Sequence, residues 1–423
     1  MKEYLTFLLR VARLSFSGGW KFYAWMSFLT VLVLVGLHAW ARQFVEGLQT
    51  TGMTNQVSWG AYIANFTFLV GVAAAAVMLV IPAYIYRQEH MHEVVVFGEL
   101  MAIAVIIMCL SFVMVDLGHP ERFHHMIPPF GIFNFPGSIL SWDVIVLNGY
   151  LLLNLHISGY LLYCRYRGRK PARPFYIPFV FISIVWAISI HTVTAFLYVG
   201  LAGRSYWHHP LVPSRFLASA FVAGPALMIL TFQIIRRLTD YHIGDRPLHT
   251  LRMIMTVAMI INMFLLGCEL FTEFYFPTQH TAAAHYLYFG LHGHDGLVPW
   301  IWTAIALDTV GLLLLITPAA RRIAWLNLAC ITCFVGIWIE KGMGLIVPGF
   351  VPTPLGQVVE YLPTWNETLV CLGIWALGAL LYSWMLHVAV PIMSGALRAR
   401  PAGPGELSLT TTMSTGNQGD TGT

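Results

Sequence analysis

Ionisable side chains inside long apolar segments are the residues of this chain that could do chemistry. Burying such groups in a bilayer is costly, so each needs a partner, a water-filled space or a function. At a helical rise of about 1.5 Å per residue, most of them are expected near one face of the membrane. This larger group contains Asp116, Asp143, His191, Glu269, Glu273, Glu340 and Lys341. The smaller group, nearer the middle or the other face, contains Glu99, His156, Asp308 and His387.

Carboxylates, imidazoles and amides gathered near one face would suit the two-electron, two-proton chemistry of a quinone. A quinone pocket needs hydrogen-bond partners for two carbonyl oxygens, groups that titrate near neutral pH, and an apolar cleft for the isoprenoid tail. We expect Asp143 and His191 to exchange the protons. Tyr62 and Asn65, which share one face of their helix, would line the headgroup pocket. Arg122, between the carboxylates at 116 and 143, would orient a carbonyl.

Purely structural roles would account for several of these residues as well. Glu340 beside Lys341 would form a simple ion pair. Tyr62 and Asn65 would then hydrogen-bond between packed helices. The sequence leaves both interpretations open for each of these residues.

The composition defines the elements that must position these side chains. Of the 423 residues, 58% are hydrophobic and 10% are charged, whereas soluble proteins carry about 25% charged residues. Apolar runs of about 20 residues recur along the chain, which predicts an all-α, polytopic membrane protein. Two four-helix bundles with two extra helices would account for the ten runs. We expect them at 22–40, 61–84, 94–115, 139–164, 175–199, 216–235, 251–276, 297–317, 324–347 and 369–391.

The distribution of basic residues predicts the orientation of these helices. Cytoplasmic loops retain Lys and Arg during insertion, and 18 of the 23 basic residues fall on the side that holds both termini. We therefore expect a cytoplasmic N-terminal segment at 1–21, the membrane domain at 22–391 and a disordered cytoplasmic tail at 392–423. The first apolar run is too long for a signal-peptide core, and we interpret it as a retained anchor.

The opposite, outer loops differ in character from the cytoplasmic ones. They hold few basic residues but nine of the 17 histidines, so we expect them to form a docking surface. The six cysteines lie in or beside apolar runs, which argues against an extracellular disulfide framework. Cys330 and Cys333 form a lone CxxC, which we interpret as packing rather than as a metal site. Any iron-sulfur cluster is therefore expected in a partner subunit.

Several separated motifs resemble those of one known family. They are Trp-Gly at 59–60 with Asn65, Asp-Leu-Gly-His-Pro-Glu-Arg at 116–122, Ser-Ile-Leu-Ser-Trp-Asp at 138–143, Ser-Ile-His-Thr-Val at 189–193, Trp-His-His-Pro-Leu at 207–211 and Leu-Pro-Thr-Trp-Asn-Glu at 362–367. Together, over about residues 58–391, they resemble the NrfD-like family of polysulfide reductase membrane subunits. Among its ten-helix variants, the chain is most similar to the DsrP-type subunit of sulfite-reduction-associated complexes.

The resemblance implies a quinone-reactive subunit in the bacterial inner membrane, without haem or metal of its own. It implies menaquinone or ubiquinone bound near the outer face, and electron exchange with a periplasmic ferredoxin-like four-cluster iron-sulfur subunit. Further membrane and cytochrome subunits would complete the complex. Where the motifs match those of the family, the resemblance assigns roles in the quinone pocket and its docking edge to Asp116, His119, Arg122, Trp142, Asp143 and His191. His119 stands where many members of the family have Arg.

Two other functions remain open. A b-type haem would need facing histidines at matched depth, for which His156 and His387 are the candidates. A transporter or proton channel would need broken helices near the midplane, for which Pro225 is a candidate. A coupled interpretation brings protons for the outer quinone through the chain. The residues on that path would be Glu99, His156, Asp308 and Glu269.

Overall fold

The fold consists of membrane-length helices, as the hydropathy pattern predicts. The computed structural model describes residues 2–276 and 281–399. Within these ranges ten helical segments are long and apolar enough to span a bilayer, and no β-strand occurs. The spans are α2 (Trp20–Glu46), α3 (Ala61–Ala73) continued by α4 (Val77–Val80), α5 (Glu89–Asp116), α6 (Ile139–Tyr166), α7 (Ile177–Val199), α8 (Val212–Leu238), α9 (Asp245–Tyr275), α11 (Val298–Ile316), α12 (Ile323–Lys341) continued by α13 (Met343–Ile346), and α14 (Trp365–Met393).

Most spans are longer than the apolar runs that predict them. Their terminal turns carry polar residues, which lower the local hydropathy without ending the helix. Helix α2 continues to Glu46, α5 begins at Glu89, and α8 begins at Val212 rather than at 216. The last difference places Arg215 inside a membrane-spanning helix, whereas the apolar run alone predicts a loop there.

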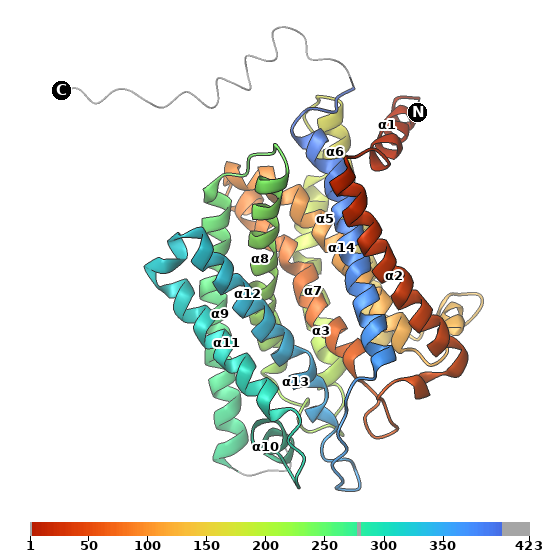
Figure 1. Ribbon diagram of the computed structural model, residues 1–423, viewed down its shortest axis with the longest axis vertical. Coiled ribbons are helices and arrows are strands. Elements are labelled where there is room, and N and C mark those ends of the chain that lie inside the picture. Colours follow the sequence, from red (N-terminus) through yellow and green to blue (C-terminus); the bar gives the residue numbers. More distant parts are fainter. Residues whose placement is uncertain (1, 277–280, 400–423) are drawn as a thin grey trace, which may run out of the picture.

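The spans form two groups of four helices and one flanking pair. Helices α3, α5, α6 and α7 pack together, and α8, α9, α11 and α12 form the second group. Helix α8 also packs against α3 and α7, so it joins the two groups. Helices α2 and α14 lie along each other, with α14 packed against α5, at one side of the molecule (Figure 1). The predicted division into two bundles with two extra helices is confirmed.

Small residues let α3 and α8 approach closely where the two groups meet. A Cβ on Gly224 of α8 would overlap the side chain of Ala75. The membrane span is irregular at this point, with a 3₁₀ turn at Ala74–Ala76 and a π-helical turn at Ile81–Ile85. Close approach of this kind is typical of helix pairs in membranes, where van der Waals packing drives association.

The flanking helices α2 and α14 meet through a second glycine contact. Gly36 and Gly373 leave no room for a side chain at either position. Two hydrogen bonds accompany this contact toward the helix ends. The Asn366 side chain donates to the carbonyl of Ala39 at 3.2 Å, and the Trp25 indole donates to a side-chain hydroxyl of α14 at 3.1 Å.

A buried carboxylate, Glu367, ties the segment before α3 to the start of α14. It accepts hydrogen bonds from the Tyr361 hydroxyl and from the Gly52 amide, the latter at 3.0 Å. With Thr364 it forms a capping box at the start of α14. Burial and the adjacent carboxylate raise the pKa of Tyr361, so its hydroxyl stays protonated. The Tyr361 oxygen in turn accepts from the Ala61 amide at 2.8 Å.

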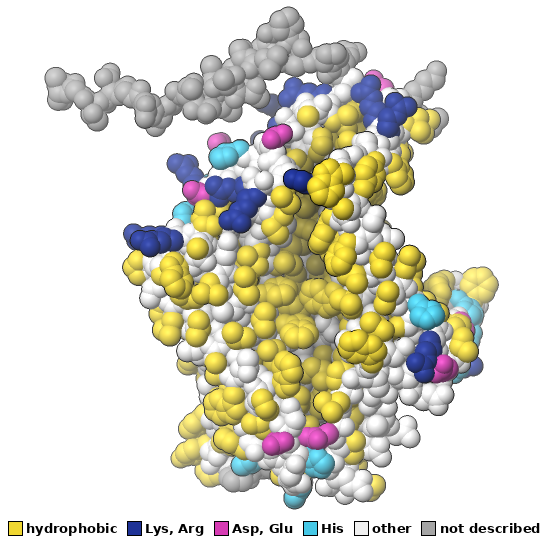
Figure 2. Space-filling view, in the orientation of Figure 1, with side chains coloured by type: hydrophobic (Ala, Val, Ile, Leu, Met, Phe, Trp, Pro, Cys, Tyr) yellow, Lys and Arg dark blue, Asp and Glu magenta, His cyan; other side chains and the backbone are white. Residues whose placement is uncertain are grey.

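The two ends of the bundle differ in charge. Most Lys and Arg side chains visible in Figure 2 gather at the end where α2 begins and α14 ends, while carboxylates and histidines occur at the opposite end. We call this opposite end the outer end, following the orientation predicted from the basic residues. Short helices lie at both ends, α1 (Lys2–Ser15) at the basic end and α10 (Thr281–Phe289) at the outer end (Figure 1). His280 and most of the tail predicted at 392–423 lie outside the described residues.

The contact of Gly224 with Ala75, in the turn that follows α3, predicts a large difference between two matched substitutions. We expect Gly224→Ala to lower the free energy of unfolding by about 1–3 kcal/mol, because overpacking a close contact forces backbone shifts. Gly267→Ala is the control, since its Cβ would meet no atom of the described residues within 4 Å. Thermal unfolding of both variants in the same detergent measures the effect, and equal melting temperatures would contradict the close packing described above.

Candidate functional site

Asp143 and His191, the two residues expected to exchange protons, are both buried at the outer half of the first helix group. Asp143 lies on α6, and Thr194 of α7 donates a hydrogen bond to its Oδ1 atom at 3.0 Å. Its Oδ2 atom is buried without a hydrogen-bond partner among the described residues. His191 lies one turn before Thr194 on α7, and its Nε2 atom is likewise buried and unpaired within the part of the chain that the structure describes. Unpaired buried polar atoms are rare in native proteins and call for an explanation, such as a ligand or a catalytic role.

Asp116 and Tyr62 lie at the outer ends of α5 and α3. The Tyr62 hydroxyl donates to Oε1 of Gln43 at 2.6 Å, and Nε2 of Gln43 donates to the carbonyl of Val115 at 2.6 Å. The Oδ1 atom of Asp116 is buried, with no hydrogen-bond partner in residues 2–276 and 281–399. The chain of bonds through Gln43 therefore holds Tyr62 beside the end of α5, one residue from this carboxylate.

Tyr198 of α7 lies in the neighbourhood of both pairs. Its hydroxyl forms a hydrogen bond with Thr67 of α3 and is fully buried. Both Asp116 and Asp143 are close enough to act on this hydroxyl electrostatically. We call Tyr62, Asp116, Asp143, His191 and Tyr198 the outer polar cluster.

Asn65, predicted to bind the headgroup, already uses its amide to join helices. Its Oδ1 atom accepts hydrogen bonds from the indoles of Trp338 at 3.0 Å and Trp375 at 2.9 Å. Its Nδ2 atom donates to the carbonyl of Ala61 at 2.8 Å and lies 3.8 Å from the sulfur of Cys371. These contacts connect α3 to α12 and α14, which matches the structural interpretation of this residue.

The motif residues of the loop after α5 lie on the surface, outside the outer polar cluster. Arg122 was expected to hold one of the carboxylates at 116 and 143 charged and to orient a quinone carbonyl, but its guanidinium is exposed and its ion pair is with Glu121 at 3.9 Å. His119 is also exposed and contacts the same carboxylate at 2.9 Å. Trp142 is 38% exposed and donates to the carbonyl of Pro136 at 3.0 Å. Hydropathy predicts the helices on either side of this loop, but it does not predict the course of the loop itself.

The residues of the predicted proton path are separated in the structure. Glu99 on α5 is buried, and neither of its carboxylate oxygens has a hydrogen-bond partner among the described residues. The expectation that His156 lies in the interior is wrong. It is exposed on α6, and its Nε2 atom lies 2.9 Å from the carbonyl oxygen of Phe175. Asp308 and Glu269 lie in the second helix group, in a cluster of charges.

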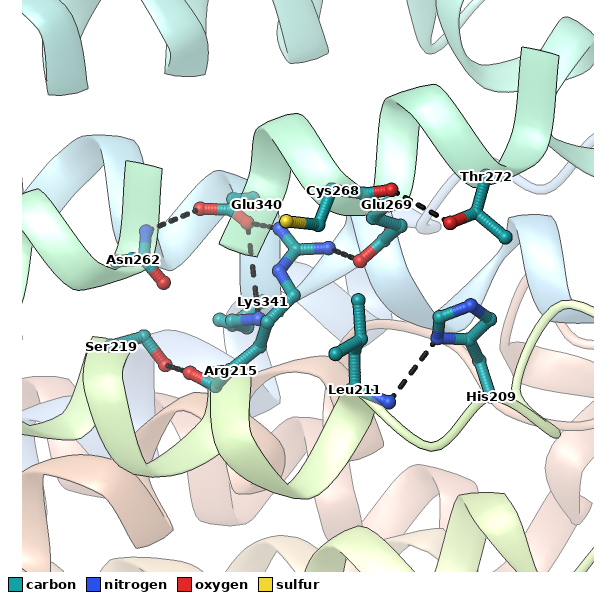
Figure 3. Close-up of polar contacts among 10 residues, drawn as sticks. All are labelled: His209, Leu211, Arg215, Ser219, Asn262, Cys268, Glu269, Thr272, Glu340 and Lys341. Atoms are coloured by element: carbon teal, nitrogen blue, oxygen red, sulfur yellow. Dashed lines mark hydrogen bonds and ion pairs between the residues drawn. The ribbon is translucent and has the colours of Figure 1, made fainter. Parts of the chain in front are cut away.

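This second cluster is centred on Arg215 of α8, as Figure 3 shows. The guanidinium forms ion pairs with Glu269 of α9 and Glu340 of α12. Lys341 is 3.8 Å from Glu340, so this predicted pair is confirmed as one edge of a larger network. Asp308 of α11 is buried within electrostatic reach of Arg215 and Lys341, and its Oδ1 atom has no hydrogen-bond partner in the described ranges. We call these five residues the Arg215 ion cluster.

Two small cavities adjoin Lys341. Each offers about 10 Å³, which is about the space of one water molecule. One cavity extends toward the outer end, where Tyr206 and His209 line it. The other lies between the two helix groups and is lined by Thr67 and Ser219 as well as Lys341. Because Thr67 is bonded to Tyr198 and Lys341 belongs to the Arg215 ion cluster, this second cavity lies between the two clusters.

Sequence reasoning missed several residues of these clusters. The apolar run predicts a loop at Arg215, although Pro213 in the first turn of α8 is a helix-start signal that would have moved the boundary. Thr194 stands three residues after His191, so helical spacing alone predicts that the two side chains lie on the same face of the helix. Gln43 falls beyond the first predicted span, because α2 is longer than its apolar run.

The geometry bears on the two alternative functions. His156 and His387 do not face each other, because His387 stacks on Phe22 at 4.0 Å and its Nε2 atom lies 2.7 Å from the carbonyl oxygen of Ser17. Within the described residues, three or more His, Cys, Asp or Glu side chains are nowhere grouped as metal ligands. Pro225 lies inside α8, which continues unbroken through it. The irregular spans in the described residues are instead the one that contains α3 and α4 and the one in which Gly342 separates α12 from α13.

Comparison with known proteins gives the family. Residues 49–351 match the family described as "Polysulphide reductase, NrfD". A putative dimethyl sulfoxide reductase membrane subunit of Halobacterium salinarum is 26% identical, over 84% of this chain and 88% of the relative. A selenate reductase subunit of Mesobacillus selenatarsenatis is 24% identical, over 76% and 81%. An Hdr-like menaquinol oxidoreductase integral membrane subunit of Archaeoglobus fulgidus is 22% identical, over 86% and 91%.

The family match covers more than half of the chain and includes the outer polar cluster and the Arg215 ion cluster. It agrees with the ten apolar helices of a multi-pass integral membrane protein. The chain therefore belongs to the NrfD polysulphide reductase family.

Proposed function

We propose that this chain is the quinone-reactive membrane subunit of a multi-subunit redox complex. The observation that carries the proposal is the set of three polar atoms at the outer polar cluster that are buried and unpaired among the described residues, Asp116 Oδ1, Asp143 Oδ2 and His191 Nε2. Hydrogen-bonding atoms left unmatched in an apolar interior suit a ligand with two oxygens, such as a quinone headgroup. A relative named as a menaquinol oxidoreductase subunit supports the same substrate class.

In such a site, the residues of the outer polar cluster have separate roles in orienting the quinone and in exchanging its protons. A bound quinone supplies two-electron chemistry at two oxygens that gain or lose protons. Asp143 holds a proton at Oδ2 while Thr194 fixes its other oxygen, and His191 exchanges a proton at Nε2. Tyr62, held by Gln43, orients the headgroup from the side of α3. The surrounding apolar helices exclude bulk water, which strengthens each of these interactions.

Electrons would reach the quinone from a partner at the outer end. We propose a periplasmic ferredoxin-like iron-sulfur subunit that docks on the loop between α5 and α6. This loop exposes apolar side chains as well as polar ones, with Phe130 at 73% and Ile132 at 84% exposure. His119 and Arg122 lie on its surface and suit contact with the partner rather than with the quinone. A bacterial inner-membrane location and additional membrane and cytochrome subunits belong to the same proposal.

The link to sulfur metabolism rests on the motifs alone. The relatives are named for dimethyl sulfoxide, selenate and menaquinol, so their names do not single out one terminal substrate. We keep the DsrP-type assignment as a proposal. Purification of the complex and identification of its soluble subunits by mass spectrometry tests it, since a sulfite-linked partner set would support it and a molybdoenzyme subunit would overturn it.

We further propose that protons move between the outer polar cluster and the Arg215 ion cluster. The water-sized cavity lined by Thr67, Ser219 and Lys341 supports this connection, because a single water there would have about three polar partners. Asp308, one of whose oxygens is unpaired among the described residues, holds a proton next to Lys341. Glu269 lies at the outer side of the cluster, and Glu99 occupies the other helix group. His156 has no part in this path.

Removing either proton-exchanging side chain should abolish the reaction. We expect Asp143→Asn and His191→Ala to lower quinone turnover by about 10²–10⁴-fold, the usual contribution of a general acid or base, while the complex stays assembled. Asn148→Ala on α6 and Thr192→Ala on α7 are controls, because each of those side chains bonds to the backbone of its own helix. Steady-state assays with menadiol or decyl-ubiquinol measure the effect. Wild-type rates in both site variants would refute the assignment.

The proton path predicts a separate phenotype in proteoliposomes. We expect Asp308→Asn to reduce the number of protons moved per two electrons, while the quinone turnover of detergent-solubilised complex stays close to that of the wild type. Thr309→Val is the control, because Thr309 lies beside Asp308 on the exposed face of α11 and bonds to its own helix. Proton uptake is followed with a pH-sensitive dye during turnover. An unchanged proton count in the Asp308 variant would eliminate the path.

The Arg215 ion cluster also predicts a stability effect. We expect Arg215→Met to destabilise the protein by about 3–5 kcal/mol, because it leaves Glu269 buried without its cation and Glu340 with Lys341 alone. The triple variant Arg215→Met, Glu269→Gln and Glu340→Gln should recover most of the loss, since no uncompensated carboxylate remains at these positions. Thermal unfolding in one detergent compares them. A triple variant no more stable than the single one would show that burial of charge is not the cause.

A further inference from the structure

An apolar groove of about 160 Å³ lies between the flanking helices and the first helix group. Leu37 and Trp40 of α2, Met114 of α5, and Ile374 and Leu377 of α14 line it. Leu37 is half exposed on the lipid-facing surface, whereas Ile374 is buried. The groove therefore leads from the lipid-facing side of the protein into its interior.

The lining of the groove suits an apolar ligand. Its polar lining side chain, Ser111, donates its hydroxyl to the carbonyl of Ile107 in its own helix. The base of the groove is the contact of Gly36 with Gly373, which holds α2 and α14 together and closes the groove there. An apolar cavity of about 150 Å³ stays dry and accepts a benzene-sized molecule. A single isoprene unit is of similar size.

The outer end of the groove lies next to residues of the outer polar cluster, through sequence neighbours and one hydrogen bond. Gln43, which holds Tyr62, stands one turn beyond Trp40 on α2. Asp116, whose Oδ1 atom is unpaired among the described residues, directly follows the groove residue Val115 on α5. The carbonyl of Val115 accepts the Gln43 hydrogen bond at 2.6 Å. A ligand that occupied both places would need an apolar chain and a polar head.

We propose that this groove binds the first isoprene unit of a quinone tail, with the headgroup at the outer polar cluster. This inference rests on the proposed function and adds the route by which the substrate enters, between α2 and α5. An isoprenoid tail fits better than a phospholipid chain, because the outer end of the groove lies next to a buried carboxylate and a tyrosine rather than next to the basic residues a phosphate would require. The flanking pair of helices thus forms part of the substrate site.

Photo-cross-linking of the full-length chain in nanodiscs tests the route. The probe is a decyl-ubiquinone analogue with a diazirine in its tail, and peptide mass spectrometry locates the label. We expect label on α2 near Leu37 and on α14 near Ile374, suppressed by an excess of tailless menadione. Ser111→Phe, which fills the groove, should reduce this labelling at least about tenfold, since loss of about two buried methylenes suffices for that factor. Thr309→Phe on the exposed face of α11 should leave it unchanged.

The possible results distinguish failure of the groove proposal from failure of the proposed function. If menadione suppresses label on other helices instead, the tail does not bind in the groove, but the proposed quinone site is still supported. Label in the groove that menadione does not suppress would identify a general lipid site, and also overturns the inference. If no label anywhere responds to menadione, the proposed function itself fails. To check that Ser111→Phe remains folded, quenching of its tryptophan fluorescence by menadione should match that of the wild type.

Discussion

The free-energy cost of burying charge among apolar helices is the constraint on which this structure depends. Arg215 lies inside a membrane span, and its guanidinium is acceptable there because two carboxylates from neighbouring helices meet it. Two cations and three carboxylates share the cluster, so much of the charge is compensated within a few ångströms. The same pairs join α8, α9 and α12, which means that the polar network also determines how the second helix group packs. An ion pair in this setting specifies an arrangement more than it adds stability.

The carboxylates of the outer polar cluster are buried in a different way from those of the Arg215 ion cluster. Within the described ranges its carboxylates, Asp116 and Asp143, form no ion pair with a cation, and the arginine expected between them lies on the surface. Apart from the Glu367 carboxylate, which acts electrostatically on Asp116, and the imidazole of His191, the groups around them are neutral, namely the hydroxyls of Thr194 and Tyr198 and the amide of Gln43. A carboxyl group in such surroundings can change its protonation without losing an ion pair that holds helices together. The packing is maintained elsewhere, by the glycine contacts and by the Glu367 network.

Hydropathy and local signals predict a large part of this fold. The ten spans and the burial of Asp143 and His191 follow from apolar length, helical rise and the scarcity of charge, whereas the grouping of the spans depends on tertiary packing. Residues outside the apolar runs were predicted less well. The role expected of Arg122 was wrong because nothing in a loop sequence fixes its course, and Arg215 was missed because the helix starts before its apolar run does. Contacts between distant segments, such as Asn65 with two indoles, depend on tertiary packing that no single-chain pattern contains.

Helix α3 shows how the separate parts of the molecule depend on one another. Successive turns of this one helix carry Tyr62, Asn65 and Thr67, which contact α2, then α12 and α14, then α7. It is buried on nearly all sides, so none of these contacts can move without the others. A ligand that displaced the Gln43 bond to Tyr62 would act on the same rigid element that holds the Thr67 bond to Tyr198. Because Thr67 also lines the cavity beside Lys341, an event at the outer polar cluster has a short physical route to the Arg215 ion cluster.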